Sequence, residues 1–431
     1  MTPLQHPVDF TGRVQAYAAV MVRIGLNLQP GQRLLIADPY ELQGVARDAE
    51  SVVAAVRSAA LAAGCPGSAA IEIQWGDARR LRDFAGKKDW RAFSRLTKAN
   101  AAMMEQSIRR GDALLFLPGS QPRLMAGLEP ADTVELRRIG WEHFGPVAQQ
   151  LVHGATNWTV APAPSPEWAM AAYEDLPPGQ QLAALWETVF AAMRVPRGSA
   201  DSGRASGNPS GGRVPVQENV LAAWQSHLAA LNRRRDELND RRLKVVRYLG
   251  TGTDLSVTLP PEHVWCTARL TTAAGVPFVA NLPTEEIFTL PHKDSATGSV
   301  RVAGPVSYGG AVIEGIELEF KRGRVERARA RTGHELLARL LETDEGAARL
   351  GEVALVETPP PWASPTTAPG PAIDVRPANR FFRHPLLDEN AAHHIALGEA
   401  YGFCLRSPNP RAMNRSLVHL DLPVDATIQL A

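Results

Sequence analysis

The first 160 residues alternate between short apolar strand patterns and longer helical patterns, and this alternation restricts the folds open to the chain. Strand patterns are predicted in four segments, at 33–37, 70–75, 113–117 and 156–161. Helical spacing of apolar residues is found in four others, at 14–24, 46–63, 79–110 and 133–152. Alternation of this kind is typical of βαβ units, in which helices cover both faces of a parallel sheet. An α/β N-terminal domain with a parallel sheet is therefore predicted.

The second half follows a different pattern. Two strand patterns within 243–259 flank Gly250-Thr251-Gly252, which indicates a hairpin, and more short strands follow within 300–328. Helices are predicted at 219–242 and 333–350. Strands that follow one another with few helices between them favour an α+β C-terminal domain.

Two segments have the composition of loops. Gly, Ser, Asn and Pro dominate 197–213, and proline dominates 359–371. We expect the first loop to end the N-terminal domain, which divides the chain into an α/β domain at 1–213 and a metal-binding α+β domain at 214–431. A chain of 431 residues is long enough for this division, because single cores rarely grow beyond ~250–300 residues.

Charge and cysteine content exclude some functions. The formal net charge is +1, which gives no electrostatic reason to expect a nucleic acid or an anionic membrane as a partner. Cys65, Cys266 and Cys404 are well separated in the sequence and form no CxxC pair, so reduced thiols are expected. There is no apolar run of ~20 residues and no secretory leader pattern, which predicts a cytoplasmic location.

Glutamate, histidine and aspartate are concentrated in the last third of the chain. Glu286 precedes Ile287-Phe288, and Glu352 precedes the apolar run 353–356. Buried carboxylates are costly unless they are paired or bound to metal, so both are candidate metal ligands. Imidazole and carboxylate suit zinc, cobalt, manganese or iron, and paired ions are typical of hydrolases that activate water.

Two further groups complete this candidate site. Glu389, His394 and Tyr401 are predicted to lie together near the start of a helix, since seven residues make almost two turns. His419 and Asp421 alternate, so in a strand both would point to the same side. The competing interpretations are a core histidine at His394 and an exposed edge strand at 419–421.

Motifs recur in order along nearly the whole chain. They lie at 25–32, 156–158, 168–169, 222–224, 250–255, 281–289, 342–347, 350–356, 387–392, 394–398 and 418–421. In order and spacing they resemble the aminopeptidase T (M29) family of metallo-aminopeptidases. The loops at 197–213 and 359–371, and the residues after Asp421, depart from the family pattern.

The resemblance implies a site with two divalent ions, zinc, cobalt or manganese. The ligands implied by motif position are Glu286, Glu352, Glu389, His394, His419 and Asp421. Tyr401 would contact the reacting centre. The resemblance also implies a homodimer whose enclosed site admits only short peptides.

The predicted function is a cytoplasmic aminopeptidase that removes N-terminal residues from short peptides by means of metal-activated water. Tyr401 is a candidate donor to the developing oxyanion, and Glu285 is a candidate general base. Two alternatives stay open at this point. One is a mononuclear iron(II) ring-cleaving dioxygenase that uses His394, His419 and Asp421, and the other is a non-catalytic peptide-binding protein.

Overall fold

The computed structural model describes residues 6–40, 43–119, 121, 123–197, 216–357, 360, 362, 381–407 and 409–431. Its α-helices are α1 (Phe10–Val20), α2 (Glu50–Ala62), α3 (Ala78–Lys87), α4 (Trp90–Arg110), α5 (Pro130–Val152), α6 (Pro166–Ala172), α7 (Pro178–Ala192), α8 (Val216–Asp240), α9 (His334–Leu341) and α10 (Pro385–Glu389). Its strands are β1 (Leu34–Ala37), β2 (Ile71–Ile73), β3 (Ala113–Phe116), β4 (Trp158–Val160), β5 (Val245–Gly250), β6 (Thr253–Thr258), β7 (Arg269–Thr271), β8 (Pro277–Val279), β9 (Glu286–Thr289), β10 (Thr297–Arg301), β11 (Val306–Tyr308), β12 (Ala311–Ile313), β13 (Glu317–Lys321), β14 (Arg324–Arg329), β15 (Leu350–Val356), β16 (His394–Gly398), β17 (His419–Pro423) and β18 (Thr427–Leu430).

The N-terminal part is built on a parallel sheet with the strand order β2-β1-β3-β4. Leu34 and Ile36 of β1 pack into a core shared with α1, α2 and α7. Leu35 and Ala37 face the other way, into a core shared with α4 and α5. Both faces are thus covered, which explains why β1 and β3 are apolar throughout. The predicted parallel sheet is confirmed.

The C-terminal part contains two larger antiparallel sheets. One has six strands in the order β14-β13-β10-β6-β5-β18, and the other has four in the order β17-β16-β15-β9. Apolar residues of both sheets meet in one core, for example Val257 of β6 with Val353 of β15 and Ile395 of β16. The last residues of the chain form β18, which pairs with β5 and completes an edge of the larger sheet.

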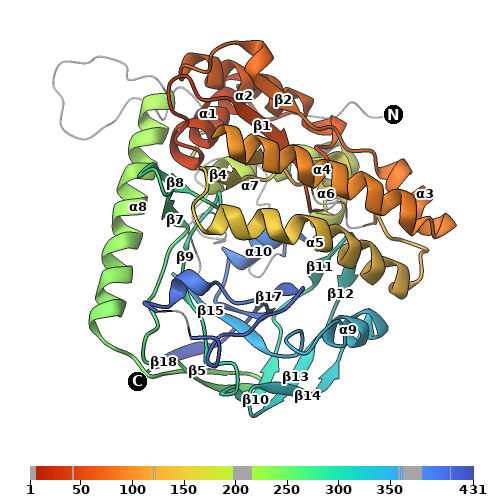
Figure 1. Cartoon of the computed structure of the whole chain (residues 1–431), viewed down its shortest axis with the longest axis vertical. Helices are drawn as coiled ribbons and strands as arrows, with labels where there is room; N and C mark the ends of the chain where they lie inside the picture. Colours follow the sequence, from red (N-terminus) through yellow and green to blue (C-terminus); the bar gives the residue numbers. More distant parts are fainter. Residues whose placement is uncertain are drawn as a thin grey trace.

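Figure 1 shows how the two parts are arranged. The parallel sheet and its helices occupy the upper half, the antiparallel sheets occupy the lower half, and α8 runs along one side of both. Helix α5 packs against α9, and α8 packs against α1 and β9. None of the helices in the described ranges is both long and apolar enough to cross a membrane.

The helix predicted at 333–350 was too long. Helix α9 ends at Leu341, because the Asp344 side chain then accepts hydrogen bonds from the backbone N–H groups of Gly346 and Ala347. A side chain that binds nearby backbone in this way favours a turn over a continued helix. The chain next enters β15 at Leu350.

The helix predicted to carry Glu389, His394 and Tyr401 was also wrong. Helix α10 ends at Glu389, His394 begins β16, and Tyr401 lies beyond that strand. Strand β16 lies between β15 and β17 and is buried on both faces, so it lacks the alternation of a half-exposed strand. A short apolar run of this kind cannot be distinguished from a buried helix by periodicity.

The two predicted loops fall almost wholly outside the described residues. Only Arg197 of the first loop is described, and only Pro360 and Trp362 of the second. The domain boundary at 213 lies in the first gap and stays a prediction.

Candidate metal centre

The small antiparallel sheet places five predicted ligands on one face. Neighbouring strands carry them, with Glu286 on β9, Glu352 on β15, His394 on β16, and His419 and Asp421 on β17. The register explains why they meet. Glu352 lies opposite Ala396, and Ala396 lies opposite Asp421. His394 and His419 are each two residues from this row along their strands, and Glu286 is four residues from it, so alternation points all three to the same side.

The carboxylates and imidazoles come within hydrogen-bonding or ion-pairing distance of one another. His394 Nε2 lies 3.2 Å from Glu286 Oε2 and 3.6 Å from Glu352 Oε1. His419 Nε2 lies 3.8 Å from Glu352 Oε2 and 3.4 Å from Asp421 Oδ1. Glu352 therefore lies between the two histidines and offers a different oxygen to each.

The sixth predicted ligand, Glu389, reaches the cluster from α10, which packs against β17. Its carboxyl group lies near Asp421, Glu286 and Glu352, whose charges add to the effect of burial on its pKa. Asn390 Nδ2 also donates to Glu389 Oε1 at 3.2 Å. The structure thus brings all six predicted ligands together in one cluster.

The cluster contains four carboxyl groups and two imidazoles, so it carries excess negative charge whenever all the carboxyl groups are ionised. The ion-pair partners of Glu286, Glu352 and Asp421 are all histidines, and within the described ranges none is a lysine or arginine. Burial raises the pKa of Glu352, and the neighbouring Glu286 raises it further, although His394 lowers it. Burial likewise raises the pKa of Glu389 well above its usual value, with added repulsion from Asp421 and Glu286.

The pKa values of the two histidines are also raised, but by their carboxylate neighbours and against the effect of burial. Burial lowers the pKa of His419, but attraction to Asp421 and Glu352 outweighs it and raises the pKa to about 9. For His394, burial also lowers the pKa, while hydrogen bonds to Glu286 and Glu352 raise it well above its usual value. The cluster by itself therefore retains protons that a divalent cation would displace.

Backbone carbonyls orient both imidazole rings. His419 Nδ1 lies 2.9 Å from the Glu399 carbonyl oxygen, and His394 Nδ1 lies 3.3 Å from that of Ala392. When Nδ1–H donates to these carbonyls, Nε2 presents its lone pair to the cluster, an arrangement common among metal-bound histidines. Carboxylate oxygens, oriented imidazoles and uncompensated negative charge fit a divalent ion such as zinc, cobalt or manganese.

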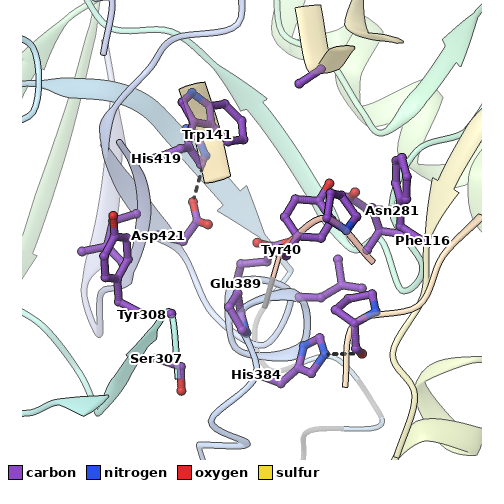
Figure 2. Close-up of a pocket in the computed structure, with 18 of the residues that line it drawn as sticks. Tyr40, Phe116, Trp141, Asn281, Ser307, Tyr308, His384, Glu389, His419 and Asp421 are labelled. Atoms are coloured by element: carbon purple, nitrogen blue, oxygen red, sulfur yellow. Dashed lines mark hydrogen bonds and ion pairs between the residues drawn. The ribbon is translucent and has the colours of Figure 1, made fainter. Parts of the chain in front are cut away.

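A cavity of about 340 Å³ opens over the cluster. The candidate ligands form one part of its wall, and aromatic side chains of the N-terminal part form another, among them Phe116, Trp141 and Phe144. Figure 2 shows labelled residues from both walls around the same space. Sequence reasoning missed the N-terminal wall, because its residues belong to separate elements and form no local motif.

Tyr401 also lines this cavity. Its ring lies 5.2 Å from that of His419 and stacks on Phe403 at 5.4 Å between centroids. Burial raises the pKa of Tyr401 well above its usual value, and Glu352, Asp421 and Glu389 raise it further. The phenol consequently keeps its proton and can act as a hydrogen-bond donor.

Glu285 has different surroundings. Its carboxylate accepts hydrogen bonds from Arg194 Nη2 at 2.8 Å and from Trp362 Nε1 at 3.0 Å. His227 Nε2 lies 3.5 Å away. Glu285 is not among the residues that line the cavity, so this geometry gives no support to the predicted general base, which stays untested.

Known proteins match the chain over almost its whole length. Residues 10–202 and 214–429 match the family model described as "Thermophilic metalloprotease (M29)". The chain belongs to the M29 family. The predicted resemblance is thus confirmed, and with it the assignment to a family of peptide-bond hydrolases.

Several M29 relatives are known as aminopeptidases. Aminopeptidase T of Thermus thermophilus is 35% identical, and the match covers 96% of this chain and 92% of the relative. Aminopeptidase 2 of Geobacillus stearothermophilus is 32% identical, with 95% and 90% covered. The solved structure of wild-type AmpT from Thermus thermophilus matches with a TM-score of 0.78 at 31% identity, and 98% of each chain is covered.

Proposed function

We propose that this M29 chain is a metal-dependent aminopeptidase that cleaves the first peptide bond of short peptides. The observation that carries the proposal is the buried cluster of carboxylates and oriented histidines, which lacks lysine or arginine partners among the described residues and faces a cavity. The names of the relatives support peptides as the substrates.

Two divalent ions are proposed to bind here. The ligands would be Glu286, Glu352, Glu389, His394, His419 and Asp421. Glu352 is suited to a shared position, because its two oxygens face different histidines. When bound, such ions lower the pKa of a water molecule and polarise a carbonyl group.

The protein's own side chains would bind and orient the substrate. The phenol of Tyr401 would donate a hydrogen bond to the oxygen of the scissile carbonyl as it gains negative charge, a role supported by its retained proton and its position beside His419. The aromatic wall formed by Phe116, Trp141 and Phe144 would receive an apolar side chain and exclude water from the cavity. The homodimer and the cytoplasmic location remain predictions.

The dioxygenase alternative would use only His394, His419 and Asp421. It leaves Glu286 and Glu352 as additional buried carboxylates beside the same histidines, and it gives them no part in the chemistry. Membership of the M29 family favours the hydrolase.

The test begins with metal-free protein reconstituted with zinc, cobalt or manganese. Release of free amino acids is measured for di- to pentapeptides and for the same peptides with an acetylated N-terminus. We expect hydrolysis of the free peptides and none of the acetylated ones, with about two ions per chain by elemental analysis. Equal cleavage of both sets, or of neither, would rule out an aminopeptidase. A single iron per chain in the protein as purified, before its metal is removed, would reopen the dioxygenase.

A further inference from the structure

A charged group of the N-terminal part also lines the cavity. Arg137, in the first part of α5, lines the same cavity as the carboxylate cluster. Within the part of the chain that the structure describes, no Asp or Glu side chain forms an ion pair with Arg137. The next residue, Arg138, is exposed and pairs with Glu135 and Glu142. Arg138 therefore has carboxylate partners among the described residues, whereas its neighbour Arg137 has none.

Contacts with both parts of the chain hold Arg137 in place. Its Nη1 donates a hydrogen bond to the backbone carbonyl of Tyr40. The guanidinium carbon also lies 5.5 Å from the centroid of the Tyr308 ring. Burial raises the pKa of Tyr308, and the nearby Arg137 lowers it. A Cβ at Gly309, where φ is +58°, would lie 2.8 Å from Arg137 Cδ. The absence of a side chain at Gly309 therefore leaves room for the side chain of Arg137.

These contacts leave part of the guanidinium available. Arginine has five N–H donors in a planar fork, and the carbonyl of Tyr40 occupies only one of them. If the Tyr308 oxygen accepts from Arg137, its own O–H remains free to donate. A fork and a hydroxyl that face one cavity match the geometry of a carboxylate.

Arg137 lies close to the carboxylate cluster. Tyr308 is the last residue of β11, which packs beside β17, and Figure 2 shows Tyr308 on the same side of the cavity as Asp421. Tyr40 lies near both charged groups, since Arg137 lowers the pKa of its phenol and Glu389 raises it, in addition to the larger effect of burial. One cavity therefore holds a centre that suits cations and, a short distance away, a cation of its own.

We propose that Arg137 and Tyr308 form a subsite for the C-terminal carboxylate of the substrate, which makes di- and tripeptides the preferred substrate class. This inference rests on the proposed aminopeptidase function. Each residue adds at most ~3.6 Å to an extended peptide, and the arginine and the carboxylate cluster line one cavity of about 340 Å³, so a short peptide suffices to reach from one to the other. Longer peptides would place an uncharged amide, which accepts less strongly, beside the guanidinium.

The first experiment needs only the wild-type protein. The value of kcat/KM is measured for leucylglycine and for leucylglycinamide, which differ in the terminal carboxylate alone. Charge-assisted pairing predicts about a 10- to 100-fold preference for the free acid. Equal values for the acid and the amide would overturn the proposal.

Variants then assign the preference to a residue. Arg137→Gln should reduce the ratio of acid to amide to about one, and Arg137→Lys should retain part of it, because lysine keeps the charge and loses the fork. Arg138→Gln is the matched control and should keep the full ratio, since it removes the same charge one residue away on the exposed face. A full ratio in Arg137→Gln would also overturn the proposal, and if that variant fails to fold, Arg137→Lys decides.

A failure of the proposed function would look different. If the metal-loaded wild type cleaves neither compound, the aminopeptidase assignment fails, and the subsite is judged by calorimetry instead. Tighter binding of leucylglycine than of its amide, lost in Arg137→Gln and kept in Arg138→Gln, would support a carboxylate subsite without peptidase activity. No difference in binding between the acid and the amide would exclude it.

Discussion

Two adjacent glutamates have opposite surroundings in this protein. Glu285 is buried against Arg194, with Trp362 and His227 as further partners. Glu286 is equally buried, but it faces His394 and a group of other carboxylates, and no lysine or arginine in the described residues pairs with it. The chain supplies an arginine to the first carboxylate, whereas we propose that a metal ion compensates the second. Burial alone thus does not identify a metal ligand, and a buried carboxylate without a lysine or arginine partner is the better candidate.

The strongest test of this contrast is Glu352→Gln, because Glu352 lies at the centre of the carboxylate cluster that has no lysine or arginine partner among the described residues. The amide keeps the shape of the side chain and removes the charge that lies between His394 and His419. Mutation of a residue that only supports a metal ligand lowers metal affinity or activity ~10–100-fold. For Glu352→Gln we expect a larger loss of both, because the variant removes a ligand itself. Elemental analysis and titration calorimetry measure it, and normal metal content in the variant would contradict the assignment of Glu352 as a ligand.

Tyr401→Phe, in the same cluster, should lower the rate of the reaction without changing metal binding. The variant keeps the ring that stacks on Phe403 and removes the hydroxyl that faces Glu352 and Asp421. We expect kcat to fall about 10²–10³-fold, as for other single donors to a developing oxyanion, while metal content stays normal. An unchanged kcat would show that the hydroxyl makes no contact with the transition state.

Glu285→Gln tests the other glutamate, which is paired with Arg194. Loss of one partner from a buried ion pair costs ~3–5 kcal/mol, and the lower end applies because the Arg194 side chain is 19% exposed. We expect urea unfolding to show this loss while the reconstituted variant retains its metal ions. Arg194→Gln should cost a similar amount, and the double variant should cost less than the sum. A large fall in kcat without a change in stability would instead support Glu285 as the general base.

The sequence was sufficient to predict the parallel sheet and some of the strands in the C-terminal part. Alternating apolar and polar patterns located β5 and β6, and the spacing of His419 and Asp421 correctly indicated a strand. It failed at β16, because a strand buried on both faces has no alternation to detect. The cavity wall with Trp141 and Arg137 could not be predicted, since it depends on how α5 packs against the antiparallel sheets.

The smallest expected effect is the pH dependence of metal binding. Without metal, the pKa of His419 is raised to about 9, because Asp421 and Glu352 outweigh the effect of burial, and the pKa of Glu389 is raised by burial and by Asp421. Each group holds a proton below its raised pKa, and metal must displace it. Metal affinity should therefore fall as pH decreases below about 9, by about tenfold, or ~1.4 kcal/mol, per pH unit for each proton released.

Calorimetry in buffers with different ionisation enthalpies counts the released protons. Glu285→Gln is the matched control, because its carboxylate belongs to the ion pair with Arg194, and it should release as many protons as the wild type. His419→Gln should release fewer protons, because its side chain carries no proton to displace near neutral pH. A metal affinity that does not change between pH 7 and 9 would mean that the cluster holds no protons for the metal to displace. The negative charge would then be compensated within the protein, as it is at Glu285, and the contrast between the two glutamates would no longer identify the metal ligands.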